Sequence, residues 1–576
     1  MKRAFVILAI SSALFSQVVK RSSQFPSIQE ELGVTIPMRD EIRLAADVFR
    51  PAGNGHFPAL LVRTPYNRKS SAMTSYRAFS RQGYAVVIED VRGRFASQGV
   101  AGAIEREGPD GNDTINWVAD QPWSNGQVAM VGASYLGIVQ WWAAIQDNPH
   151  LVTIAPVNSG DDEYLDRFYS PGGALKLGHR LLWLAQNFTP PAQVRPRFGT
   201  YISHLPIRTS DVAATGTVVP WWRLALAHPS YDSYWKALSI RQNLPRVRIP
   251  VLSMSGWFDN YAESELDAFT RLSRSGDTVE TWIGPWPHVP ALKFATRNFG
   301  PEAQLHIRAV QAEWFDRWMK KREPLERSTP ESVLHVFVMG PDIWREEHEW
   351  PLARTRFAPF YLVSNGHANS VNGDGALTWQ PVRKSVTDGF TYDPRNPVPT
   401  TGGAICCDPR VLPPGPLDQT MVERRADVLV YTSPRLTEEM EVTGPVRALL
   451  YVSTSANDTD FTAKVVDVQP DGRPLLVCDG IQRLRYRISL DKPVFVRRNN
   501  KYQVSVDAGV TSYVFMPGHR IRLEVSSSNF PRFDRNLNSV GPNADETRIV
   551  KARQTLYHEK GYPSAVILPV IPKGRG

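Results

Sequence analysis

Ser134 stands in the segment GASYLG (residues 132–137), between a short apolar run and a helix-like pattern. Residues 128–131 are typical of a buried parallel strand. A serine at a tight strand-to-helix turn points its hydroxyl outward, and the N–H of the next residue, here Tyr135, is free to bind an oxyanion. The usual motif is G-x-S-x-G, however, and Leu136 takes the place of its last glycine. The segment alone fits a nucleophile and an ordinary glycine-rich turn equally well.

Two further residues supply the side chains that a nucleophilic serine requires. Asp259 follows the predicted strand 249–255, and His288 follows the predicted strand 279–283. Open α/β sheets build their sites at the carboxyl ends of strands, and α/β-hydrolases use the chain order Ser, Asp, His. We therefore predict a catalytic triad of Ser134 as nucleophile, His288 as general base and Asp259 as the carboxylate that orients the imidazole.

The elements around these residues alternate between strands and helices. Short apolar runs are separated by segments of helix length, which predicts βαβ units and a parallel sheet, and therefore an α/β fold. A hairpin is expected over residues 34–49. The predicted strands are 59–62, 84–88 and 128–131, and the helices between them are 75–82 and 110–119.

Two other regions have a different pattern. Residues 151–246 are rich in Leu, Arg, Trp, His and Pro and show no strand run, so we predict a helical lid insertion. After residue 358, short alternating strands predict an all-β jelly-roll sandwich. The predicted organisation is a leader at 1–24, an α/β-hydrolase domain at 25–150 and 247–357, the lid at 151–246, and the sandwich at 358–576.

The N-terminus resembles a secretory signal. Met1, Lys2 and Arg3 give a positive start, and residues 4–15 are largely apolar. The segment predicts export to the periplasm or the medium, although its cleavage site is weak; the alternative is a cytoplasmic protein with an N-terminal extension. No other run is long enough to cross a membrane.

Composition excludes some function classes. The chain has 576 residues and a net charge of +9, without a basic cluster interleaved with aromatics, so we expect no nucleic-acid partner. The three cysteines lack zinc spacing, so no metal site is predicted. We also predict no cofactor, because a serine hydrolase needs none. We expect the adjacent Cys406 and Cys407 to be packed thiols rather than a vicinal disulfide.

Several short motifs together identify a family. RTPY (63–66), DVRGR (90–94), GWFD (256–259) and GPWPH (284–288) join GASYLG in resembling cocaine-esterase-type (CocE/NonD) hydrolases, which belong with the X-Pro dipeptidyl-peptidases (S15) and glutaryl-cephalosporin acylases. The resemblance extends from about residue 34 to 570. It implies an α/β-hydrolase with a galactose-binding-like C-terminal sandwich, and G-x-S-Y-x-G is this family's own spacing. It also implies that the Tyr66 hydroxyl is the second oxyanion donor.

Substrate recognition is less defined by the sequence. Phe168 and Tyr261 are aromatic candidates for the wall of an acyl pocket, and either fits the core equally well. The acidic residues 161–163 and Asp166 fit the first turn of a helix better than an ammonium site. Arg92 and Arg94 suggest anion binding, although pairing with nearby carboxylates is the simpler expectation.

The predicted function is a serine hydrolase that cleaves acyl esters or amides through a covalent acyl-enzyme, as carboxylesterases and acylases do. The enzymatic alternative is an Xaa-Pro dipeptidyl-peptidase-like or α-amino-acid ester hydrolase. The non-enzymatic alternative is a glycan- or protein-binding scaffold with a relic hydrolase domain. The expected partner is a small ester or amide, with no membrane; a homo-oligomer is compatible with the sequence.

Overall fold

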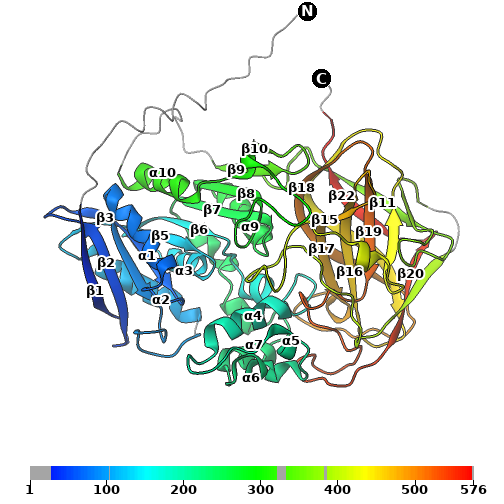
Figure 1. Cartoon of the computed structure of the whole chain (residues 1–576), viewed down its shortest axis with the longest axis horizontal. Helices are drawn as coiled ribbons and strands as arrows, with labels where there is room; N and C mark the ends of the chain where they lie inside the picture. The colour runs from blue at the N-terminus through cyan, green and yellow to red at the C-terminus, as the bar shows by residue number, and fades with distance from the viewer. Residues whose placement is uncertain (1–26, 103, 321–331, 382–385, 574–576) are drawn as a thin grey trace, which may run out of the picture.

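The computed structural model describes residues 27–102, 104–320, 332–381 and 386–573, which form two large β-sheets (Figure 1). The first sheet has ten strands in the order β1-β2-β4-β3-β5-β6-β7-β8-β9-β10. Its strands β3 to β9 run parallel, while β1, β2 and β10 pair antiparallel at the two ends. Its strands are β1 Ile28–Pro37, β2 Arg43–Pro51, β3 Phe57–Thr64, β4 Ala85–Asp90, β5 Ser124–Ala133, β6 Leu151–Val157, β7 Val251–Phe258, β8 Val279–Pro287, β9 Val333–Val338 and β10 Ile343–Glu347.

Helices join the strands of this sheet, as the alternating pattern predicts. All residues of β4 and β7 are buried, which is expected where helices cover both faces of a parallel sheet. The predicted hairpin is formed by β1 and β2, and the segment expected to be helical at 75–82 is a 3₁₀ helix. The helices are α1 Ser71–Thr74, α2 Glu107–Ala119, α3 Tyr135–Ala144, α9 Ala262–Arg274 and α10 Ile307–Met319.

The expectation that residues 151–246 contain no strand is wrong at its first residues. Leu151–Val157 forms β6, which lies between β5 and β7 in the parallel sheet. Its sequence LVTIAPV is a short buried run that resembles the other central strands, and Pro156 obscured the pattern because proline is uncommon in central strands. The helical insertion therefore starts after this strand.

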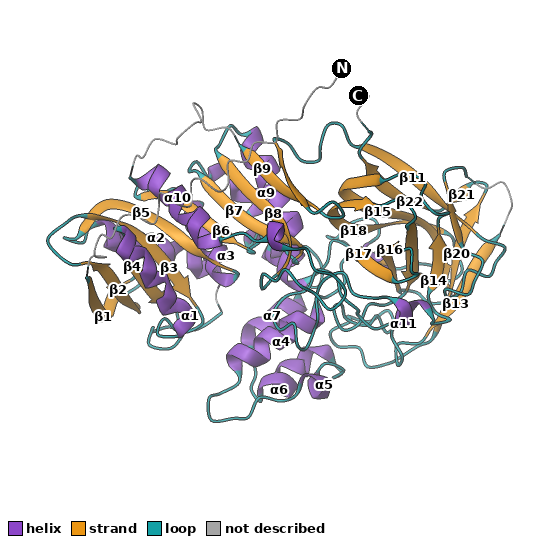
Figure 2. Ribbon diagram, turned by 45° about the horizontal axis from the view of Figure 1, so that its top comes forward, coloured by secondary structure: helices purple, strands orange, loops and turns teal. Residues whose placement is uncertain are grey.

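The remainder of the insertion is helical and packs against the C-terminal part of the chain. Figure 2 shows α4 to α7 gathered into one group apart from the other helices. The N–H of Gly178, on α4, donates to the carbonyl of Pro531 (2.8 Å), and the N–H of Leu175 donates to Asp534 (2.8 Å). After a π-helical turn at Glu163–Phe168, the helices are α4 Leu177–Phe188, α5 Phe198–Tyr201, α6 Ser210–Thr215, α7 Pro220–Ala227 and α8 Ser233–Ala237.

The C-terminal part is a β domain built on a twelve-stranded sheet, as the alternating pattern after residue 358 predicts. The two long strands β15 and β18 pair antiparallel with each other. One short helix, α11 Thr420–Glu423, precedes β14. The strands are β11 Arg356–Val363, β12 Ala376–Thr378, β13 Thr387–Tyr392, β14 Leu429–Thr432, β15 Met440–Thr454, β16 Asp460–Val468, β17 Pro474–Arg483, β18 Tyr502–Phe515, β19 Arg520–Ser526, β20 Ala552–Glu559, β21 Tyr562–Pro563 and β22 Ala565–Val570.

The expectation for the adjacent cysteines is also wrong. Cys406 and Cys407 form a vicinal disulfide, and Cys407 adopts a positive φ of 95° in the turn that holds it. The preceding residue, Ile405, donates its N–H to the carbonyl of Phe258 (3.3 Å), so this loop lies beside the end of β7. No helix among the residues described above is long and apolar enough to span a bilayer.

Candidate active site

Ser134 occupies a strained turn between β5 and α3. Its backbone has φ 60° and ψ −123°, a conformation that L-residues rarely adopt. A Cβ on Gly132 would lie 2.5 Å from the Leu136 side chain, and one on Gly137 would lie 2.6 Å from Ser159. Both glycines are therefore needed for close packing around the turn. The turn has the geometry of the nucleophile elbow that the sequence predicts. Its second glycine, Gly137, lies where α3 packs against Ser159.

Two donors are placed to stabilise an oxyanion beside Ser134. Tyr135 is the first residue of α3, where a helix leaves its N–H groups without intrahelical partners. The Tyr66 hydroxyl accepts from Trp183 Nε1 at 3.0 Å, and an interaction with the Ser134 side chain acts on the pKa of this phenol. Burial raises the pKa of Tyr66, so the phenol is neutral and keeps its proton for donation.

The Tyr135 side chain belongs to a buried network that fixes the elbow. Its hydroxyl donates to Glu107 (2.7 Å), Glu107 pairs with Arg63 (2.8 Å), and Arg63 also pairs with Glu89 (2.7 Å). These side chains come from α3, α2, β3 and β4, so the network ties α3, which begins directly after Ser134, to α2 and two strands of the sheet. Burial, followed by the charge of Glu107, raises the pKa of Tyr135 well above its ordinary value.

His288 and Asp259 meet as predicted. Asp259 directly follows β7 and His288 directly follows β8, and the imidazole Nδ1 lies 2.6 Å from Asp259 Oδ2. The other carboxylate oxygen accepts the N–H of Tyr261 (2.7 Å), and Asn158 donates to the His288 carbonyl (2.8 Å). With Nδ1 committed to the carboxylate, Nε2 is the ring nitrogen left to act as a base.

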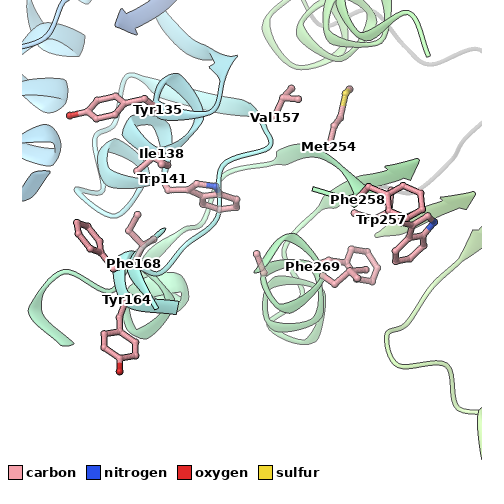
Figure 3. Close-up of a cluster of buried hydrophobic side chains, with 14 of the residues drawn as sticks. Tyr135, Ile138, Trp141, Val157, Tyr164, Phe168, Met254, Trp257, Phe258 and Phe269 are labelled. Carbon is pink, nitrogen blue, oxygen red and sulfur yellow. The ribbon is translucent and has the colours of Figure 1, made fainter. Parts of the chain in front are cut away.

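The two aromatic candidates both lie near this site. The Tyr261 ring centroid is 5.6 Å from that of His288. Phe168 lies in the wall of a pocket that Tyr135 and Trp183 also line. Figure 3 shows that Phe168 and Tyr164 project to opposite sides of their short helical segment, so one segment serves both the pocket and the core.

Two residues of this aromatic pocket, Trp183 and Tyr135, also belong to the surroundings of the oxyanion donors. Trp183, which donates to Tyr66, forms one wall, and its indole stacks on the Tyr135 ring with a centroid distance of 6.4 Å. The cavity has a volume of about 50 Å³. The aromatic residues of the wall are Tyr135, Phe168, Trp183, Phe188, Trp221, Tyr234 and Trp235.

Most of the acidic cluster is used inside the protein. Asp161 pairs with Arg241 (2.9 Å), Asp162 caps the helical turn that follows it, and Asp166 accepts the N–H groups of both. These three carboxylates therefore have structural partners within the protein, as expected for the first turn of a helix rather than for an ammonium site. Within the described ranges, no grouping of three His, Cys, Asp or Glu side chains is arranged to hold a metal.

The sequence prediction missed the basic residues and the tryptophan that the insertion contributes. Arg180 and Trp183 lie on α4, three residues apart and hence on one face, and Arg167 lies in the last turn of the π-helical segment Glu163–Phe168. Arg94, for which a carboxylate partner was expected, instead donates to the carbonyls of Pro65 and Asn187 and lines the pocket. Helical spacing alone gives no sign that this face of α4 turns toward Ser134.

The fold and the arrangement at Ser134 define a serine hydrolase of the α/β-hydrolase class. The chain belongs to the X-Pro dipeptidyl-peptidase (S15) family. The S15 domain description matches residues 40–290, and that of the X-Pro dipeptidyl-peptidase C-terminal non-catalytic domain matches residues 323–567.

Relatives cover nearly the whole chain. The cocaine esterase of Rhodococcus sp. (strain MB1 Bresler) is 38% identical over 568 residues, which is 94% of this chain and 98% of that protein. An aminopeptidase from a marine sediment Thaumarchaeota archaeon has a TM-score of 0.82 at 25% identity and covers 95% of this chain and 97% of its own. An α-amino acid ester hydrolase has a TM-score of 0.80 at 24% identity, with 98% and 100% covered.

Replacing Tyr66 with phenylalanine tests the second oxyanion donor. We expect Tyr66→Phe to lower kcat by about 10²- to 10³-fold with little change in KM, because the hydroxyl is used most strongly in the transition state. Steady-state kinetics on 4-nitrophenyl butyrate measures this. Tyr76→Phe, which removes the hydroxyl of a tyrosine whose ring contacts Arg308, is the matched control. Equal kcat values for Tyr66→Phe and the wild type would remove Tyr66 from the oxyanion hole.

Proposed function

We propose that Ser134, His288 and Asp259 hydrolyse a small acyl ester by way of an acyl-enzyme. The observation that carries this proposal is the 2.6 Å contact between His288 Nδ1 and Asp259 at the ends of neighbouring strands, on the sheet edge where Ser134 forms the elbow. A carboxylate bound at Nδ1 fixes the tautomer with a lone pair on Nε2 and stabilises the imidazolium.

The two half-reactions follow from this geometry. His288 Nε2 takes the Ser134 proton as Oγ attacks the acyl carbonyl, and the oxyanion is held by the Tyr135 N–H and the Tyr66 hydroxyl. The imidazolium then returns the proton to the leaving alcohol, and the C–O bond breaks. In the second half, His288 deprotonates a water that attacks the acyl-enzyme, which releases the acid and regenerates Ser134.

Contacts in the acidic cluster favour an ester without a free α-ammonium group. Asp161, Asp162 and Asp166 are bound to protein groups, and Glu163, which lines the pocket, pairs with Arg167 at 2.6 Å. An aminopeptidase or α-amino ester hydrolase needs a carboxylate available to the substrate ammonium. The name of the cocaine esterase relative points in the same direction.

A substrate panel tests this proposal. We expect the purified protein to hydrolyse 4-nitrophenyl acetate and butyrate much faster than Xaa-Pro anilides or α-amino-acid esters, and a fluorophosphonate to label Ser134. Steady-state kinetics measures the substrate preference, and mass spectrometry of the labelled peptide shows whether Ser134 carries the fluorophosphonate. Preferential cleavage of Xaa-Pro anilides would replace the ester proposal with the dipeptidyl-peptidase alternative, and absence of labelling would favour a scaffold role.

Two further proposals concern the rest of the chain. We propose a jelly-roll topology for the C-terminal β domain, supported by its match to the X-Pro dipeptidyl-peptidase C-terminal domain. We also propose export, which rests on the signal-like residues 1–24; these lie outside the described residues. Mature protein that retains Met1 in N-terminal sequencing would contradict export.

A further inference from the structure

A cleft in the C-terminal β domain has a strong excess of positive charge in its wall. Among the described residues that line it, four are arginines and one, Glu423, is acidic. The cleft has a volume of about 390 Å³ and shares no lining residue with the aromatic pocket. This volume is typical of sites for small ligands, which span about 300 to 1,000 Å³. The arginines are Arg424, Arg435, Arg520 and Arg522.

These arginines come from three separate segments of the chain. Arg424 directly follows α11, and Arg435 lies between β14 and β15. Arg520 and Arg522 are two residues apart on β19, so their side chains leave the same face of that strand. Arg435 Nη1 donates to the carbonyl of Gly518, two residues before β19, at 2.8 Å. The cleft therefore gathers guanidinium groups that are distant in sequence around one space.

Only one of the four guanidinium groups is paired with a carboxylate. Arg522 lies 2.5 Å from Glu423, and both residues are buried. Arg520 donates to a backbone carbonyl at 2.9 Å. In the part of the chain that the structure describes, no carboxylate lies within 4.0 Å of Arg424, Arg435 or Arg520. Three positive charges therefore face the cleft without an anionic partner from the protein.

The buried groups below the cleft do not supply the missing negative charge. Glu524 lies on the same face of β19 as Arg522 and is 2% exposed. Burial raises the pKa of Glu524 to about 8 against the opposing charge of Lys464, so this carboxyl carries a proton near pH 7. Lys464, opposite Glu524 on β16, donates to the side chain of Gln419 at 3.2 Å. The cleft thus remains positive down to its floor.

We propose that this cleft binds a small oxyanion of the phosphate class that carries two or more negative charges. A phosphoryl group presents three acceptor oxygens in different directions, which suits guanidinium groups from three segments, whereas a planar carboxylate matches the edge of one guanidinium. The side chains of Asn372, Thr420 and Gln469 also line the cleft and can donate further hydrogen bonds. No aromatic ring is among the described lining residues, so we do not expect the ligand to carry a stacked base.

Calorimetric titration of the full chain with sodium pyrophosphate tests this site. At low salt we expect one pyrophosphate per chain, with an affinity that falls as the salt concentration rises. Arg424→Gln removes an exposed guanidinium and should weaken binding by about 10- to 100-fold, the range of a charged hydrogen bond. Arg424→Lys should keep part of the affinity, because it keeps the charge. The matched control is Arg356→Gln, an exposed arginine on β11 outside the cleft, which should bind as the wild type does.

Two results would overturn the proposal. Equal affinities of Arg424→Gln and Arg356→Gln for pyrophosphate would show that the cleft is not the site. Citrate carries a similar charge on planar carboxylates and should bind more weakly than pyrophosphate; equal binding would overturn the phosphate class. The inference does not rest on the esterase activity, so Ser134→Ala protein should bind pyrophosphate as the wild type does, and Arg424→Gln should hydrolyse 4-nitrophenyl butyrate at the wild-type rate.

Discussion

Ser134→Ala should lower kcat for 4-nitrophenyl butyrate by about 10⁴- to 10⁶-fold, because loss of the nucleophile leaves only substrate binding and the oxyanion donors. The variant should also resist labelling by a fluorophosphonate. Steady-state kinetics and intact-protein mass spectrometry measure these effects. Wild-type turnover in this variant would show that another residue attacks the ester.

Ser134→Gly is the matched control for stability. The native φ of 60° at this position is strained for serine and unstrained for glycine. We therefore expect Ser134→Gly to be as inactive as Ser134→Ala. Its free energy of unfolding should exceed that of Ser134→Ala by about 1 kcal/mol, the lower end of the cost of such a conformation. Thermal denaturation of the three proteins measures the difference. A Tm of Ser134→Gly below that of Ser134→Ala would contradict backbone strain at residue 134.

Asp259→Asn should lower kcat by about 10⁴-fold, with the fold intact, because an amide can donate to Nδ1 and would stabilise the wrong imidazole tautomer. Asp259 accepts from both His288 Nδ1 (2.6 Å) and the Tyr261 N–H (2.7 Å), so the asparagine retains the shape of this contact but not its charge. The loss should appear in kcat and in the rate of fluorophosphonate labelling alike.

Asp267→Asn is the control for this change. Asp267 lies on α9, eight residues further along, and its carboxylate pairs with the exposed Arg271 at 2.6 Å. Its replacement should leave kcat and the labelling rate at wild-type values. If both variants lost activity equally, the effect would stem from general destabilisation of the loop and helix after β7, and the orienting role of Asp259 would fall.

The local sequence was enough to place the three triad residues, because each of them follows the end of a predicted strand. The six residues from Gly132 to Gly137 indicated a tight strand-to-helix turn, and only the ordered positions of Asp259 and His288 and the family motifs favoured a nucleophile there. The positions of Asp259 and His288 were readable because parallel strands all end at one edge of the sheet. Strand β6 was missed because its pattern includes a proline in a region otherwise rich in helix formers.

The tertiary structure alone decided what surrounds the triad. The direction in which a helix face points depends on packing against distant segments. On α4, Gly178 donates its N–H to the Pro531 carbonyl, and Trp183 on the same helix donates to the Tyr66 hydroxyl. The partners of Arg94 and Arg180 follow from that docking, and so does the pairing of Glu163 with Arg167. The sequence by itself indicated the reaction class, because the chain order of Ser134, Asp259 and His288 and their places at strand ends can be read along the chain. The acyl pocket required the fold, because its charges come from segments that meet only after the insertion has packed.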